Sequence, residues 1–95
     1  MTLEETLGEL LAMDGRRVIV SVCGNRVPTT VIVTGVLRRP RGPNGEAARF
    51  IFFPLDEGVS GICLDRESFE GAGWDDGILR VRLGPLLLTV EEATG

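Results

Sequence analysis

The chain has no histidine, no tyrosine and no lysine among its 95 residues, and all ten of its basic residues are arginines. Histidine is the usual general acid or base near neutral pH, and tyrosine and lysine are among its substitutes. Proton transfer would therefore fall to carboxylates and to two cysteines. These absences argue against most enzyme mechanisms, and we expect no catalytic residue, no cofactor site and no metal site.

Aromatic residues and long apolar runs are also scarce. One tryptophan and four phenylalanines leave an aliphatic core, and 95 residues form a single domain, residues 1–95, which buries about 60 to 70% of the unfolded surface. No apolar run approaches the roughly 20 residues that cross a bilayer. The first thirteen residues carry acids where a secretory leader carries basic residues. We therefore expect a cytoplasmic protein, and the exclusive use of arginine is typical of a GC-rich bacterial genome.

The two cysteines, Cys23 and Cys63, each lie inside an apolar segment. A reduced cysteine in such a segment behaves as a small hydrophobic residue. A nucleophilic cysteine needs a stabilised thiolate, and the chain offers no histidine for that purpose. Both cysteines are therefore predicted to be buried core residues.

The chain begins with the pattern of a short amphipathic helix. Thr2 and Glu5 have the spacing of a capping box, and leucines recur at helical spacing until Asp14 and Gly15 end the pattern. This predicts a helix over residues 2–13. A helix so short needs a docking surface for its leucines, either on its own domain or on a neighbour.

From residue 16 the apolar period changes to two, which indicates strands. Gly35 inside an apolar run suggests a bulge or a sharp bend, and Pro54 is expected to end a strand. The dense turn formers of residues 40–45 predict an exposed loop. The expected strands cover residues 17–23, 29–38, 48–53, 59–64, 78–83 and 86–90.

Asp65 is expected to cap one helical turn over residues 65–70, followed by a flexible Gly71-Ala72-Gly73. Residues 92–95 form a polar tail. Short connections between strands favour antiparallel pairing. The predicted fold is mainly β: a short N-terminal α-helix and a five- to six-stranded antiparallel small barrel over residues 16–91.

This order of elements resembles the Sm-like small barrels. The resemblance is carried by Leu10-Leu11 before Gly15, the valine strand that follows, Thr34-Gly35-Val36-Leu37 and Val81-Arg82-Leu83-Gly84. It implies an RNA-binding fold of bent strands. The aspartate and asparagine that hold RNA bases in that family are absent here, near Arg41 and Gly45. Other SH3-like barrels produce much the same pattern, so both topologies stay open.

Charge is unevenly distributed along the chain. Residues 15–55 hold seven arginines against Glu46, a net of +6, whereas residues 56–95 have a net of -6 and the first fourteen residues add -4. Guanidinium groups bind phosphate oxygens in pairs. The candidate binding residues for nucleic acid or a partner are Arg38, Arg39, Arg41 and Arg49. Three interpretations remain: a solvated loop, a nucleic-acid site, or a basic surface that meets the acidic half of a second copy.

Two further features have simpler structural explanations. The acids Asp65, Glu67, Glu70, Asp75 and Asp76 do not match the spacing of a known calcium loop, and capping and turn formation explain most of them. Trp74 is expected to cover one end of the barrel rather than to bind a ligand.

The leading hypothesis is a non-enzymatic interaction module that self-associates. This hypothesis rests on the excess of leucine in the helix and in Leu86-Leu87-Leu88. The alternative is an RNA- or DNA-binding protein that uses the four arginines, although the acidic isoelectric point and the lack of neighbouring aromatics weaken it. An enzyme whose active site is shared between subunits is the third hypothesis. The sequence does not identify a small-molecule ligand.

Overall fold

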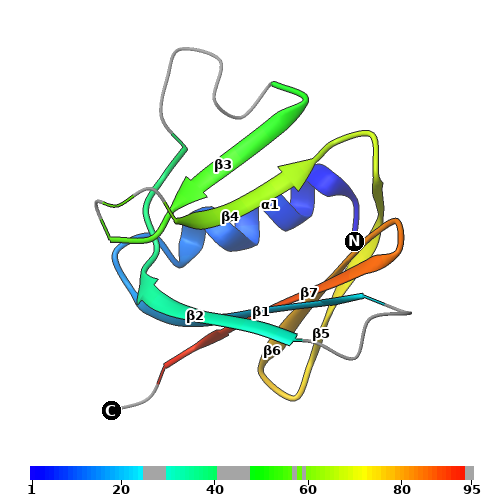
Figure 1. The fold of residues 1–95 in the computed structure, drawn as a ribbon. Helices are drawn as coiled ribbons and strands as arrows, with labels where there is room; N and C mark the ends of the chain where they lie inside the picture. Colours follow the sequence, from blue (N-terminus) through cyan, green and yellow to red (C-terminus); the bar gives the residue numbers. More distant parts are fainter. Residues whose placement is uncertain (25–29, 41–47, 57, 59, 94–95) are drawn as a thin grey trace.

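The computed structural model describes residues 1–24, 30–40, 48–56, 58 and 60–93. In this part of the chain one helix precedes a series of strands (Figure 1). The elements are α1 (Leu3–Ala12), β1 (Arg17–Gly24), β2 (Thr30–Val36), β3 (Phe50–Pro54), β4 (Gly61–Asp65), β5 (Phe69–Asp75), β6 (Ile78–Leu83) and β7 (Leu86–Glu92). Among the residues described, no helix has the length and apolar character needed to cross a membrane.

The predicted capping box starts α1. The Thr2 side-chain oxygen accepts a hydrogen bond from the Glu5 backbone N–H (3.1 Å), and the Thr2 N–H donates to the Glu5 carboxylate (2.9 Å). This backbone hydrogen bond is the main reason that the pKa of Glu5 is below its ordinary value. Leu7 and Leu10 are buried in the core, and Leu3 and Leu11 pack against it. The leucines of the helix thus dock on their own domain.

The strands form two antiparallel sheets. The larger has five strands in the order β2-β1-β7-β6-β5, and the smaller is the hairpin β3-β4. The mainly β class, the N-terminal helix and the antiparallel pairing are therefore confirmed. The described strands do not close into a barrel. A single bridge, between Leu37 and Leu55, joins the hairpin to the end of β2.

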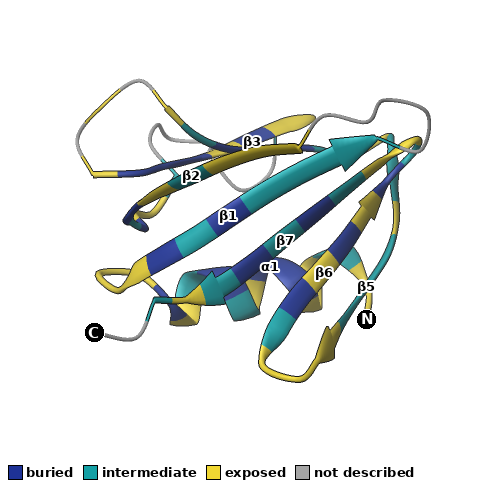
Figure 2. Cartoon of the chain, turned by 60° about the horizontal axis from the view of Figure 1, so that its bottom comes forward, coloured by how far each residue is buried: buried dark blue, intermediate teal, exposed yellow. Residues whose placement is uncertain are grey.

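The helix and the hairpin lie on one face of the five-stranded sheet (Figure 1). No described element covers the opposite face, which turns toward the viewer in Figure 2. A sheet covered on one face should have strands in which buried and exposed residues alternate. This is clear in β6, where Leu79 and Val81 are buried and Arg80 and Arg82 are exposed. The core fills the space between the sheet, α1 and the inner face of the hairpin.

The segment after Asp65 differs from its prediction. The Asp65 carboxylate accepts hydrogen bonds from the Glu67 N–H (3.1 Å) and the Ser68 hydroxyl (2.8 Å), but the turn ends there and no helical turn forms. Gly71-Ala72-Gly73, predicted to be flexible, is the middle of β5 and pairs with β6. Asp76 and Gly77 both have positive φ (53° and 79°), which is typical of a two-residue hairpin turn. This turn sets the register of β5 despite its glycines.

The two expectations about strand ends have different outcomes. Pro54 ends β3, as predicted, and is itself the last residue of the strand, paired with Gly61; its carbonyl accepts a hydrogen bond from the Arg38 N–H (2.9 Å). Glu92, predicted to belong to the tail, is the last residue of β7 because it pairs with Val18 of β1. The loop at residues 41–45, the start of the predicted strand at residue 59 and tail residues 94–95 lie outside the described residues.

Gly35 does not form a bulge. The β1-β2 register runs without a shift from Arg17 opposite Val36 to Cys23 opposite Thr30, and the register shift in this sheet lies between Phe69 and Gly71. A Cβ atom on Gly35 would lie 2.9 Å from Asp56 Oδ2 and 3.0 Å from Leu55 Cβ. Glycine is therefore required there because the hairpin approaches β2 closely.

Candidate functional site

The hairpin and β2 meet at one corner, around Leu37 and Leu55. The Val36 N–H donates to Asp56 Oδ1 (3.0 Å), and the Asp56 N–H donates to the Val36 carbonyl (2.7 Å). Asp56 has a positive φ of 56°, a conformation that aspartate tolerates better than most residues. With Gly35 beneath it, this paired contact fixes the corner from which β2 and the hairpin separate.

An apolar cleft of about 340 Å³ lies between the hairpin and the half of the sheet that includes β1, β2 and β7. Its deep residues include Val20, Ile62 and Leu88, each at most 3% exposed. Its rim includes Val31 (59% exposed), Phe52 and Leu86. The cleft therefore combines a buried apolar floor with an exposed apolar rim.

Among the described residues, none that lines the cleft is charged. The polar residues of this lining are Ser60 and Cys63, both exposed. A charged group that entered would lose its hydration without gaining a partner. The site is therefore chemically suited to uncharged, apolar groups.

The outer edge of β2 borders this cleft. The Leu37 N–H donates to the Arg16 carbonyl on the β1 side (2.9 Å), whereas the N–H and C=O of Val36 bond to Asp56 on the other side. Because these directions alternate along a strand, the N–H and C=O groups of Thr30, Ile32 and Thr34 point away from β1. Within the described part of the chain, none of these groups has a hydrogen-bond partner.

The side chains of β2 do not protect this edge. The strand, Thr-Val-Ile-Val-Thr-Gly-Val, has no charge and no proline, and Val31 and Ile32 are 59% and 64% exposed. Charged residues, prolines and bulges are the usual means of blocking further strand pairing. We call the outward side of residues 30–34 the open edge.

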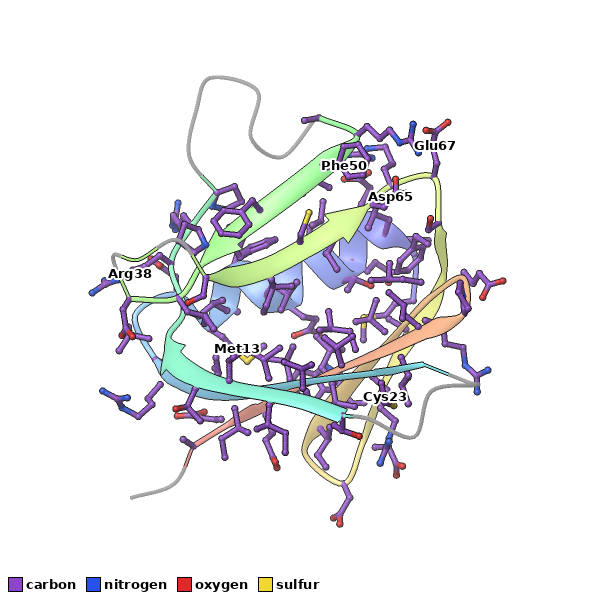
Figure 3. All side chains as sticks on the ribbon, viewed as in Figure 1. Met13, Cys23, Arg38, Phe50, Asp65 and Glu67 are labelled. Atoms are coloured by element: carbon purple, nitrogen blue, oxygen red, sulfur yellow. The ribbon has the colours of Figure 1, made fainter. Side chains whose placement is uncertain are left out.

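The predicted arginine cluster does not come together among the described residues. Arg38 follows the corner, whereas Arg49 precedes β3 at the other end of the hairpin. Figure 3 shows this separation between Arg38 and the group formed by Phe50, Asp65 and Glu67. Arg39 lies next to Arg38, and Arg41 lies outside the described residues.

Arg49 is engaged by carboxylates instead. Its Nε and Nη2 donate to the two Asp65 oxygens (3.1 and 3.5 Å), and it also pairs with Glu67. Its guanidinium carbon lies 4.8 Å from the centre of the Phe50 ring, a cation–π contact. The hydrogen bond from Arg49 is the main reason that the pKa of Asp65 is below its ordinary value, and the same bond raises the pKa of Arg49.

Other arginines of the basic segment are paired with acids of the same chain. Arg39 Nε lies 3.3 Å from Asp14 Oδ2, and Arg16 Nη1 lies 3.1 Å from Glu92 Oε2. These pairs join the basic segment to the acidic first residues and to the acidic second half. The charge separation seen along the sequence is thus partly compensated within one molecule.

The cysteine prediction is wrong in both cases. Ile62 and Leu64 of β4 face the core, so that the Cys63 side chain between them points away from the core and is exposed. Cys23 is partly exposed, and both thiols are free. On β1, Cys23 alternates with the cleft residue Val22 and therefore lies on the uncovered face of the sheet.

The remaining candidates also have structural partners. Asp75 pairs with Arg80 (3.2 Å), and Asp65 and Glu67 with Arg49. Trp74 is 46% exposed on β5, beside a shallow hollow that Arg80, Arg82 and Leu87 help to line. Its predicted position over a barrel end has no counterpart in two unclosed sheets.

The cleft and the open edge are the features that sequence reasoning missed. The uncharged run at residues 30–36 was a signal for the edge, but the cleft depends on how two sheets meet. Comparison of the chain with models of protein families, with curated proteins and with solved structures found no match.

Proposed function

We propose that this protein is a non-enzymatic interaction module that self-associates by pairing its open edge with the open edge of a second copy. The observation that carries the proposal is the backbone edge of Thr30, Ile32 and Thr34, which lies in an uncharged strand and has no hydrogen-bond partner among the described residues. Unpaired edges of this kind serve as templates for a further strand. The leucines of α1 give less support than the sequence suggested, because the core contains them.

Two β2 strands fit together in an antiparallel arrangement about a two-fold axis. With Ile32 opposite its own counterpart, Thr30 of each copy lies opposite Thr34 of the other. The outward groups of these three residues then form about six hydrogen bonds between the copies. Val36 is not needed for this register and keeps its bonds to Asp56.

The side chains of β2 favour this pairing. On one face Ile32 meets its counterpart, and on the other face Val31 meets Val33. No charged residue of β2 faces a like charge, because the strand has none. An isologous contact of this kind needs only one self-complementary surface.

The test is the molar mass in solution, measured by sedimentation equilibrium over a wide concentration range. We expect the wild type to form a dimer and Ile32→Lys to be a monomer, because the substitution places like charges opposite each other. Trp74→Lys, which adds the same charge to the opposite edge strand, is the matched control and should remain dimeric. A monomeric wild type at every concentration, or a dimeric Ile32→Lys, would contradict the proposal.

The alternative of RNA or DNA binding through Arg38, Arg39, Arg41 and Arg49 has less support from the geometry. Arg49 lies at the far end of the hairpin from Arg38 and binds two carboxylates. The assignment to an Sm-like or SH3-like small barrel stays a hypothesis from the sequence.

A further inference from the structure

We propose that the apolar cleft between the hairpin and the sheet binds the hydrocarbon chain of a neutral aliphatic molecule, such as a long-chain alcohol or ester. This site is separate from the open edge, and the proposal does not rest on self-association. The cleft has a floor of buried apolar residues and a rim of apolar residues that are about half exposed.

The shape of the cleft is that of a binding site rather than a packing defect. Its volume of about 340 Å³ lies in the range of small-molecule sites, which are mostly apolar and formed before binding. Its floor of Val20 and Leu88 also belongs to the core. Rigid strands therefore hold the cleft open between the sheet and the hairpin.

A ligand that covers the rim of the cleft would gain binding free energy, because the rim is apolar and exposed. Val31, Phe52 and Leu86 are all large, apolar and at least 38% exposed. They belong to three different strands that meet at the same cleft. A hydrocarbon chain that lies between them removes its own apolar surface and theirs from water.

The uncharged lining of the cleft favours neutral ligands over charged ones. In the described part of the chain no charged residue lines the cleft, and the polar residues of the lining are Ser60 and Cys63. A fatty-acid carboxylate would find no cationic partner in this lining, whereas a neutral hydroxyl or ester needs none. The lining is also mostly aliphatic, with Phe52 as its aromatic side chain. The structure therefore favours a neutral aliphatic chain.

The first experiment measures the fluorescence of the neutral probe N-phenylnaphthylamine with the full chain. We expect the probe to bind and decyl alcohol to displace it, with ionised decanoate at least about tenfold weaker. Val22→Phe fills the cleft from β1 and should weaken probe binding by about tenfold or more. Ile19→Phe places the same ring on the opposite face of β1 and should bind as the wild type does. Circular dichroism checks that both variants fold.

The second experiment uses Leu86→Cys, because Leu86 lines the cleft and is 44% exposed. The rates at which iodoacetamide alkylates the introduced thiol and the native Cys23 are measured separately by mass spectrometry. Decyl alcohol should slow alkylation at position 86, in the cleft, and leave Cys23, on the uncovered face, unchanged. Equal rates with and without the alcohol at position 86 would overturn the proposal, and so would decanoate that binds as tightly as decyl alcohol.

The Ile32→Lys variant separates this proposal from the proposed function. The Ile32 side chain is on the opposite face of β2 from Val31 and Val33, which line the cleft. Probe binding by a monomeric Ile32→Lys supports the cleft as a ligand site whatever the fate of self-association. If protection of the thiol introduced by Leu86→Cys instead rises with protein concentration in the absence of alcohol, a second copy covers the cleft and the ligand proposal fails.

Discussion

The two edges of the five-stranded sheet differ in how they are protected from further strand pairing. The edge strand β5 contains a register shift after Phe69 and two charged residues, Glu70 and Asp75. The Met1 amino group donates a hydrogen bond to the Ala72 carbonyl (3.0 Å), and α1 contacts this strand. The edge strand β2 has a regular register and no charge.

The comparison shows that edge protection is a local property of sequence rather than of topology. Both strands are at the end of the same ladder, and both have seven residues. The two strands differ in sequence and in register. Strand β5 has charged residues, glycines and a register shift, whereas β2 is rich in β-branched residues and pairs regularly. Exposed β-branched edges are costly because they invite aggregation, and their retention in β2 is consistent with use in pairing.

The largest difference is expected when one glycine of each edge strand is changed to alanine. Gly35→Ala should lower the free energy of unfolding by about 1 to 3 kcal/mol, because its Cβ would collide with Leu55 and Asp56 at the corner. Gly73→Ala in β5 meets no atom within 4 Å and should change it by less than about 0.5 kcal/mol. Urea denaturation measures both, and equal losses would show that the corner is not tightly packed.

A smaller loss is expected when the contact that ends the open edge is removed. Asp56→Ala deletes the acceptor for the Val36 N–H and should cost about 1 to 2 kcal/mol. It also adds one residue to the open edge, so that association should not weaken. Asp56→Asn keeps an acceptor and tolerates the positive φ, and it should behave almost as the wild type does. The measurements are thermal unfolding and sedimentation, and an equally destabilised Asn variant would refute this role.

The turn that leads into β5 should make stability depend on pH. Because the pKa of Asp65 is lowered in the folded state, its contribution is present above the ordinary carboxylate pKa and is lost as the pH falls through the lowered value. Asp65→Asn should therefore show a smaller drop in melting temperature on acidification than the wild type. Asp76→Asn, in the next turn, is the control. Parallel pH profiles for wild type and Asp65→Asn would contradict the assignment.

The smallest effect is expected from the surface arginines beside β2. Arg38→Ala combined with Arg39→Ala removes one exposed ion pair, to Asp14, and should change the free energy of unfolding by about 0.5 kcal/mol or less. It should also leave retention on single-stranded DNA at low salt unchanged. A clear loss of salt-sensitive retention in the double variant would instead revive the nucleic-acid hypothesis.

The sequence predicted the local elements well because their signals are local. The capping box, the change of apolar period after residue 16 and the turn at Asp76-Gly77 each act within a few residues. The helix, the antiparallel class and most strands follow from them. Strand β5 was missed because its glycines favour turns, whereas pairing with the distant strand β6 holds them extended.

The candidate site could not be predicted because it depends on contacts between distant segments. The arginine cluster assumed that residues 29–38 and 48–53 form one hairpin, which would bring Arg49 next to Arg38. In the structure these strands share a single bridge, at Leu37 and Leu55, so the two arginines separate. The same splaying leaves the barrel unclosed and creates the cleft. Which side of β4 faces the core decides whether Cys63 is buried, and period alone does not reveal it.

The asymmetry of the sheet also determines how far an assembly can grow. If both edge strands of the sheet could pair with another molecule, copies would add without limit and form fibres. The Met1 amino group and the charges of β5 obstruct the second edge of the five-stranded sheet, so that the proposed pairing has one edge of this sheet to use. If two molecules pair as proposed, both sheets use that edge, and the product would be a finite ten-stranded sheet rather than a polymer.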